Sequence, residues 1–113
     1  MAKSFDTAGP CGPALVTRDE VPDPQALELR THVNGEVMQS ASTSSMIHTV
    51  AQLIAHISAL ATLLPGDLIA TGTPGGVGVA REPPRFLRAG DTVTVTISGV
   101  GQLTDSSRWD SAK

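Results

Sequence analysis

The residues best suited to chemistry lie in a glycine-rich loop that carries two threonines. The run Leu68-Ile69-Ala70-Thr71-Gly72-Thr73-Pro74-Gly75-Gly76-Val77-Gly78 begins as an apolar stretch and ends in that loop. Glycines let a backbone adopt positive φ and approach a ligand, and each threonine hydroxyl can donate and accept hydrogen bonds. Polar groups in a tight loop after a buried strand suit an anionic ligand, which makes Thr71, Gly72 and Thr73 candidate binding residues. The alternative is a plain connecting loop, which is what most glycine and proline clusters form.

Lys3 is the second candidate, because it precedes the segment Ser4-Phe5-Asp6-Thr7 in a region of small residues. A lysine held beside an apolar pocket can stabilise an oxyanion. The ordinary alternative is a solvated lysine near the chain terminus, and the residues alone favour it.

Other chemistries have weaker support in the sequence. The glycine-rich loop lacks the Lys-Ser/Thr pair of a P-loop and the spacing of a dinucleotide-binding loop. His32, His48 and His56 have no carboxylate partner at a ligand-like spacing, so the residues alone predict no metal site. We expect His32 to face outward and His56 to be half-buried. Cys11 has no partner readable from the sequence, and a lone cysteine usually behaves as a small apolar residue.

Composition limits the class of protein. The 113 residues carry a net charge of −3 and are 40% apolar, which suits one small domain. The absence of a basic run and the scarcity of aromatic residues argue against a nucleic acid partner. No apolar run reaches the roughly 18 residues of a membrane span. With a single cysteine and no signal core, the sequence predicts a cytoplasmic protein.

The elements that must position the candidate residues are mostly strands. Residues 27–33 alternate between apolar and polar types, which predicts a half-buried strand. Asn34-Gly35 follows at once and predicts a tight hairpin, because both positions of that turn need positive φ. The return strand is predicted over 36–40. A short strand over 13–17 and a turn over 18–24 are predicted before the hairpin.

The spacing of apolar residues along the chain changes after a loop predicted over 40–45. Apolar residues recur at helical spacing over 50–62, and Thr49 with Gln52 fits a capping box. Pro65-Gly66 is expected to end this helix, the main one in the chain.

A similar short motif, predicted to form a turn followed by the start of a strand, then occurs twice. Leu64-Pro65-Gly66-Asp67-Leu68-Ile69 is followed later by Arg88-Ala89-Gly90-Asp91-Thr92-Val93. We expect each turn to feed a strand, the second over 92–98, and we expect 102–104 to pair back. Residues 81–85 are predicted to be a surface loop. The tail over 106–113 is polar, although Trp109 could dock on the domain.

Together these segments resemble the fumarylacetoacetate hydrolase family. The resemblance runs from about Ala2 to Leu103, with its motifs in family order. Those motifs are Lys3-Ser4-Phe5-Asp6-Thr7, Gly12-Pro13, Asp19-Glu20-Val21-Pro22-Asp23-Pro24, Val33-Asn34-Gly35-Glu36, Thr43-Ser44-Ser45-Met46-Ile47, Pro65-Gly66-Asp67-Leu68-Ile69 and Thr71-Gly72-Thr73-Pro74-Gly75-Gly76-Val77-Gly78.

The resemblance implies a mixed α+β fold that is mainly β, a roll or sandwich with one main helix over about 50–62. Residues 1–105 correspond to the C-terminal part of the catalytic domain, which predicts an incomplete domain, and 106–113 form a polar tail. Members of the family are usually homodimers, so a homo-oligomer is expected.

The resemblance also implies a chemistry. Family members act on small dioxo or oxo-enoic acids such as acylpyruvates, by hydrolysis, decarboxylation, isomerisation or hydration. Mg²⁺, or sometimes Ca²⁺ or Mn²⁺, chelates the substrate and acts as a Lewis acid. Lys3 matches a catalytic lysine beside the metal, Thr7 matches a threonine near the metal, and Thr73 matches a threonine that binds the substrate.

The chain also departs from the family pattern. The family's Glu-x-Glu and Asp metal ligands, and its water-activating histidine, lie upstream of the lysine and have no match here. Ala14 stands where an aromatic residue is common. Two hypotheses are therefore open: a metal-dependent enzyme that this chain supplies with a substrate-side loop and a lysine, or a truncated, catalytically inactive remnant.

Overall fold

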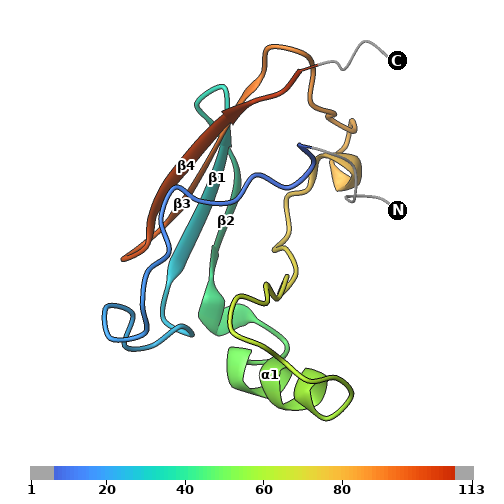
Figure 1. Cartoon of the computed structure of the whole chain (residues 1–113). Coiled ribbons are helices and arrows are strands. Elements are labelled where there is room, and N and C mark those ends of the chain that lie inside the picture. The colour runs from blue at the N-terminus through green and yellow to red at the C-terminus, as the bar shows by residue number, and fades with distance from the viewer. Residues whose placement is uncertain (1–6, 109–113) are drawn as a thin grey trace, which may run out of the picture.

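The computed structural model describes residues 7–108, and its main feature is a four-stranded antiparallel sheet. The strand order across the sheet is β2-β1-β3-β4 (Figure 1). The strands are β1 (Glu28–Val33), β2 (Glu36–Ser42), β3 (Thr92–Ile97) and β4 (Gly101–Ser106).

The predicted hairpin is confirmed. Asn34 and Gly35 have φ of 51° and 83° and join β1 to β2. Pairing continues as far as Glu28 opposite Ser42, so β2 is longer than predicted. The predicted loop over 40–45 is therefore wrong in part: its first residues extend the strand, and Thr43–Ser45 form a short 3-10 helix, η1, capped by the Ser42 hydroxyl.

The predicted pairing near the C-terminal end of the fold is also confirmed. β3 lies between β1 and β4, with Val95 opposite Thr31 on one side and Leu103 on the other. β4 is longer than the predicted 102–104, because its ladder with β3 runs to Ser106. A second 3-10 helix, η2 (Gly78–Ala80), precedes the loop over 81–85.

Helix α1 (Val50–Ser58) begins where predicted and ends sooner. The Thr49 hydroxyl accepts a hydrogen bond from the Gln52 N–H, and the Gln52 side chain accepts one from the Thr49 N–H, so the capping box is confirmed. At the end of the helix the Leu60 N–H bonds the Ile57 carbonyl, three residues back, so the last turn tightens from α to 3-10 geometry. His56 is exposed, which corrects the expected half-buried position.

Two predicted strands, the one over 13–17 and the one expected to follow the turn at Asp67, are wrong. Neither pairs with another strand among residues 7–108. Leu15 is 95% exposed and Leu68 is 82% exposed. An extended segment becomes a strand only when a neighbour takes its hydrogen bonds, and neither segment has one in the described part of the chain.

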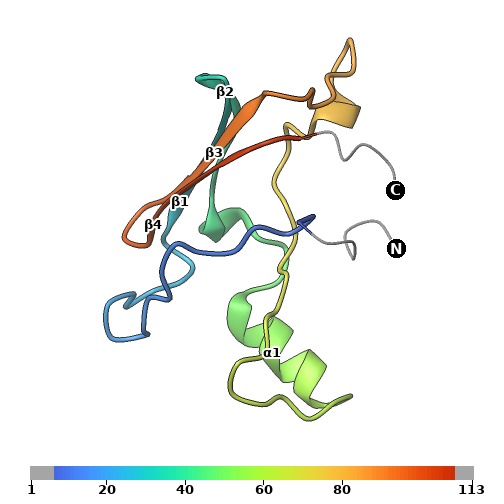
Figure 2. The same cartoon turned by 45° about the horizontal axis from the view of Figure 1, so that its top comes forward.

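The described residues bury few large side chains. Val33 and Met38, on adjacent strands, are the buried apolar residues between positions 7 and 108, and α1 has no buried residue. Figure 2 shows α1 below the sheet, with the segment that follows it running back up beside the sheet. No helix in this part of the chain has the length and apolar character needed to cross a bilayer. The predicted class, mainly β with one main helix and an incomplete domain, agrees with this arrangement.

Candidate functional site

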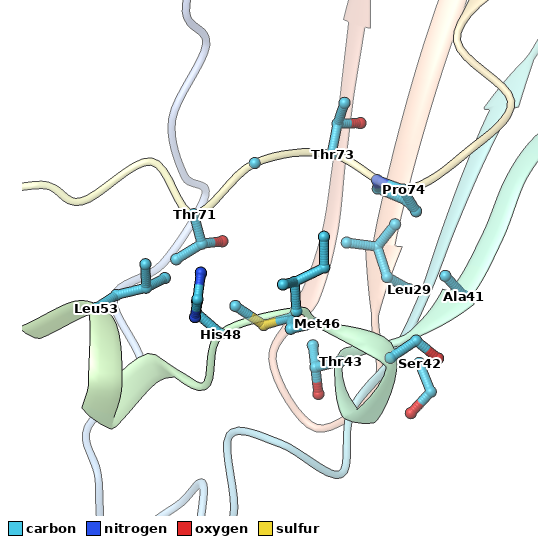
Figure 3. A pocket seen from close by; sticks show the side chains of 13 residues that line it. Leu29, Ala41, Ser42, Thr43, Met46, His48, Leu53, Thr71, Thr73 and Pro74 are labelled. Atoms are coloured by element: carbon cyan, nitrogen blue, oxygen red, sulfur yellow. The ribbon is translucent and has the colours of Figure 1, made fainter.

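A pocket of about 500 Å³ lies where the sheet, the segment 43–48, the start of α1 and the glycine-rich loop meet (Figure 3). Its lining is mostly apolar, with several hydroxyl groups and one imidazole. The lining residues are Leu29, Ala41, Ser42, Thr43, Ser45, Met46, Ile47, His48, Leu53, Thr71, Gly72, Thr73 and Pro74.

Gln25 holds one wall of this pocket in place. Its Nε2 donates to the Thr43 carbonyl at 2.9 Å, and its Oε1 accepts from the Val50 N–H at 2.7 Å. The Thr43 hydroxyl in turn accepts from the Leu27 N–H at 2.9 Å. One glutamine therefore ties the segment between β2 and α1 to the chain before β1. The sequence analysis missed it, because its partners lie far along the chain.

The two threonines of the glycine-rich loop point in different directions. The Thr71 side chain points towards His48, whereas the Thr73 side chain points away from Thr71 and from His48 (Figure 3). The Thr73 hydroxyl accepts a hydrogen bond from Gln39 Nε2 at 2.9 Å. A hydroxyl that accepts a bond still has its own proton to donate, so Thr73 keeps one donor for a ligand.

The glycines of the loop serve two different purposes. Gly72 has φ of 111° and open space where a Cβ would stand. Gly76 also has positive φ, but a Cβ there would collide with the Met38 carbonyl, and a Cβ on Gly78 would collide with the Arg85 carbonyl. The close approach expected towards a ligand is therefore, at Gly76 and Gly78, an approach to the protein's own backbone. The buried strand expected before the loop is absent, since Leu68 is exposed and unpaired among the described residues.

Two arginines attach the following loop, 81–85, to β2. Arg81 Nη2 donates to the Met38 carbonyl at 2.8 Å and Arg81 Nε donates to the Gly76 carbonyl at 3.3 Å. Arg85 forms an ion pair with Glu36. The predicted surface loop is thus tethered to the sheet, and it fixes the end of the glycine-rich loop.

The structure brings some of the predicted site residues together and separates others. Thr71, Gly72 and Thr73 all line the pocket. Thr7 is exposed, with φ of 70°, and is not among the lining residues. Lys3 lies outside the described residues. His48 lines the pocket, and sequence reasoning gave it no role.

The described residues do not fit a divalent cation. Between positions 7 and 108 no three His, Cys, Asp or Glu side chains gather as metal ligands would. The one ionisable side chain in the pocket lining is His48, and hydroxyls with a single imidazole are a poor donor set for Mg²⁺ or Ca²⁺.

A sequence model described as the fumarylacetoacetate (FAA) hydrolase C-terminal domain matches residues 1–106. The chain belongs to this family. A relative from Burkholderia ambifaria is 55% identical over 107 residues, which make up 94% of this chain and 38% of that protein. The chain therefore spans a little over a third of the length of the curated relatives it matches.

Solved structures agree with this assignment. Fumarylacetoacetate hydrolase from Exiguobacterium antarcticum is 43% identical with a TM-score of 0.90, over 94% of this chain and 38% of that one. Maleylpyruvate hydrolase from Sphingobium sp. SYK-6, in complex with manganese(II) and pyruvate, is 39% identical with a TM-score of 0.82, over 90% and 36%. A 2-hydroxyhepta-2,4-diene-1,7-dioate isomerase from Mycobacterium marinum is 53% identical with a TM-score of 0.70, over 80% and 33%.

Proposed function

We propose that this chain binds a small oxo acid in the pocket beside Thr71–Gly72–Thr73. We propose further that it takes part in a reaction of the family type on a dioxo or oxo-enoic acid such as an acylpyruvate. The observation that carries the proposal is the placement of all three predicted loop residues on one pocket of about 500 Å³. The names of the similar structures, a maleylpyruvate hydrolase and a heptadienedioate isomerase, support a substrate of this class.

The lining suggests how such an acid is held. Leu29, Met46 and Leu53 offer apolar contacts to a short carbon chain. The Thr71 hydroxyl, near His48, and the Thr73 hydroxyl, on the other side of the loop, can each donate to a different oxygen-bearing group of the acid, and a hydrogen bond to a charged group contributes about 1.5–3 kcal/mol. Lys3 is proposed as the catalytic group that stabilises oxyanion charge on the substrate, and Lys3 and Thr7 are proposed to lie near the metal that the family uses. The chain's own part in the reaction is then binding, orientation and charge stabilisation.

A second candidate function is binding without turnover. The observation that favours it is that residues 7–108 form no metal donor set. If the family's Mg²⁺, Ca²⁺ or Mn²⁺ is needed, its ligands must come from outside these residues.

Homo-oligomerisation in the cytoplasm is a further part of the proposed function. It rests on the uncovered apolar side chains of Ile47, Leu60 and Leu68 and on the lone cysteine.

Calorimetry and an absorbance assay test both candidates. Pyruvate is titrated into the whole chain with and without Mn²⁺, and loss of the enol absorbance of an acylpyruvate is followed in parallel. Thr73→Val should weaken pyruvate binding roughly tenfold or more, as expected for a lost bond to a charged group. Thr104→Val, on β4 away from the pocket, is the matched control and should bind as the wild type does.

The outcomes separate the candidates. Turnover that Lys3→Ala abolishes supports the enzyme. Pyruvate binding without turnover supports the second candidate. If the wild type neither binds pyruvate nor consumes the acylpyruvate, the proposed function is wrong for this chain.

A further inference from the structure

Gln39, on β2, makes the contact that links the sheet to the threonine of the glycine-rich loop. Its Nε2 lies 2.9 Å from the Thr73 hydroxyl oxygen and 2.9 Å from the Pro74 carbonyl oxygen. The backbone of Gln39 is fixed in turn by the β1–β2 ladder, where it pairs with Thr31. The side chain therefore reaches from a paired strand to two adjacent loop residues.

The chemistry of the partners settles which way the amide faces. The Pro74 carbonyl can only accept, so the atom facing it must be the nitrogen of Gln39 and not the oxygen. The amide nitrogen has two hydrogens and no acceptor, and the two contacts use both of them. Thr73 must then be the acceptor in its contact with Gln39. Its own hydroxyl proton cannot point at Gln39 and remains available for a ligand.

The rest of the loop is held by contacts that do not reach Thr73. Arg81 bonds the Gly76 and Met38 carbonyls, and Gly76 packs directly on the Met38 carbonyl. These contacts fix the loop after Pro74. Before Thr73, Gly72 has positive φ, and no atom lies within 4 Å of the place where its Cβ would stand. Gln39 is thus the side chain that fixes the place of Thr73 and keeps its hydroxyl proton from pointing back at β2.

We propose that Gln39 is a positioning residue: it holds Thr73 on β2 and turns the Thr73 hydroxyl into a donor for the carboxylate of a bound oxo acid. The inference rests on the proposed function, because it needs a ligand that accepts this bond. A site whose supporting side chain fixes the donor before binding avoids reorganisation when the ligand arrives.

The test compares Gln39→Glu with Gln102→Glu. The first change replaces the donor by a carboxylate, which would take the Thr73 proton and repel the Pro74 carbonyl. The second makes the same change on β4, where Gln102 contacts Thr96 and Thr104, away from the pocket. By calorimetry we expect Gln39→Glu to weaken pyruvate binding about tenfold or more and Gln102→Glu to change it less than about twofold.

A double variant and a ligand-free measurement make the role specific. If Gln39 acts through Thr73, Gln39→Glu combined with Thr73→Val should bind pyruvate no more weakly than Thr73→Val alone, since the two residues form one unit. In the free protein, three-bond NMR couplings to the Thr73 γ-methyl group should report one χ1 rotamer in the wild type. Gln39→Leu, which removes the donor and offers the Thr73 hydroxyl no acceptor, should average them, and Gln102→Leu should not.

These readouts separate the inference from the proposed function. If the wild type binds no pyruvate, the proposed function fails, while averaged Thr73 couplings in Gln39→Leu still support the positioning role. Equal pyruvate affinity in the wild type and Gln39→Glu, additive losses in the double variant, or unchanged Thr73 couplings would each overturn the inference.

Discussion

In the turn Leu64–Asp67 and in the turn Arg88–Asp91 the aspartate carboxylate accepts a hydrogen bond from the N–H of the first residue, at 2.8 Å in both. The aspartate N–H donates back to the carbonyl of that first residue, at 3.1 Å in one turn and 3.0 Å in the other. The glycines before the aspartates have φ of 99° and 90°. The two similar sequence motifs therefore form the same local structure.

The segments that leave the two turns differ. After Asp91 the chain enters β3, which is paired on both sides. This second turn is also tied to its surroundings: Gly90 N–H donates to the Ser107 carbonyl at 2.9 Å, and Asn34 Nδ2 donates to the Asp91 carboxylate at 2.8 Å. After Asp67 the chain is extended and unpaired in the described part of the molecule, and Leu68 is 82% exposed.

The comparison shows which structural information is local. A turn closes on itself, so its residues determine it. A strand needs hydrogen-bond partners supplied by another segment, so similar turn sequences lead to β3 in one place and to an unpaired segment in the other. The glycine-rich loop follows the unpaired segment, and its position therefore depends on the contacts with β2.

The largest expected effect on stability comes from introducing a carboxylate beside β3, compared with the same change in the unpaired segment after Asp67. Val33, 5% exposed, lies opposite Val93 in the ladder beyond the second turn. Val33→Asp should lower the free energy of unfolding by about 3 kcal/mol or more, because it buries a charge without a partner. Leu68→Asp, after the first turn, should change it by less than about 0.5 kcal/mol.

Urea denaturation followed by circular dichroism measures both variants. Equal destabilisation by Leu68→Asp and Val33→Asp would contradict the expected difference between the two segments. That result would mean that Leu68 is covered in solution, as self-association would cover it. Light scattering on the wild type and on Leu68→Asp would then show whether the substitution lowers the mass of the particle.

An intermediate effect is expected at the two turn glycines. Gly66→Ala and Gly90→Ala both place a side chain at φ near +90°, which costs roughly 1–2 kcal/mol of local strain. Only Gly90 belongs to a turn bonded to the sheet region, so Gly90→Ala should lower global stability by about that amount. Gly66→Ala should loosen its own turn and leave the urea midpoint nearly unchanged. Equal shifts of the midpoint would show that the first turn is also coupled to global unfolding.

Sequence reasoning worked where the signal is local. The Asn34-Gly35 hairpin and the Thr49–Gln52 capping box depend on residues within a few positions of one another, and both are present. The β3–β4 hairpin was predicted for the same reason, from the alternating segment 92–98, the glycine turn after it and the short segment 102–104 expected to pair back. The loop residues Thr71–Thr73 were predicted from their types and from the family resemblance, and they line the pocket.

Sequence reasoning failed where the outcome depends on distant segments. Gln39 and Thr73 are 34 positions apart, and Gln25 and Val50 are 25 apart, and no local pattern marks such pairs. The strand predicted after the turn at Asp67 begins with suitable residues but lacks a partner among positions 7–108. The direction in which the Thr73 hydroxyl can donate depends on Gln39, and nothing in the loop sequence predicts that contact.

The smallest effect expected is a change in acid sensitivity at the second turn. The Arg88 N–H, and next the Asn34 amide, donate to Asp91 and hold the pKa of its carboxyl below the ordinary 3.8. A carboxyl whose pKa is lowered in the folded state contributes stability above its unfolded pKa, and this contribution is lost as pH falls through the folded value. Asn34→Gly keeps the positive φ that the hairpin needs and removes the amide donor.

Asn34→Gly should therefore raise the pKa of Asp91 towards its ordinary value and reduce stability most above about pH 4. Below that pH the wild type loses the same contribution, so the difference between the two urea midpoints should shrink as the pH falls from about 7 to below about 3. Carboxyl ¹³C shifts of Asp91 measured across the same range give the pKa directly. A difference in midpoint that stays constant over this range would mean that the amide stabilises the hairpin through its other bond, to the Thr92 N–H, and not through the carboxylate.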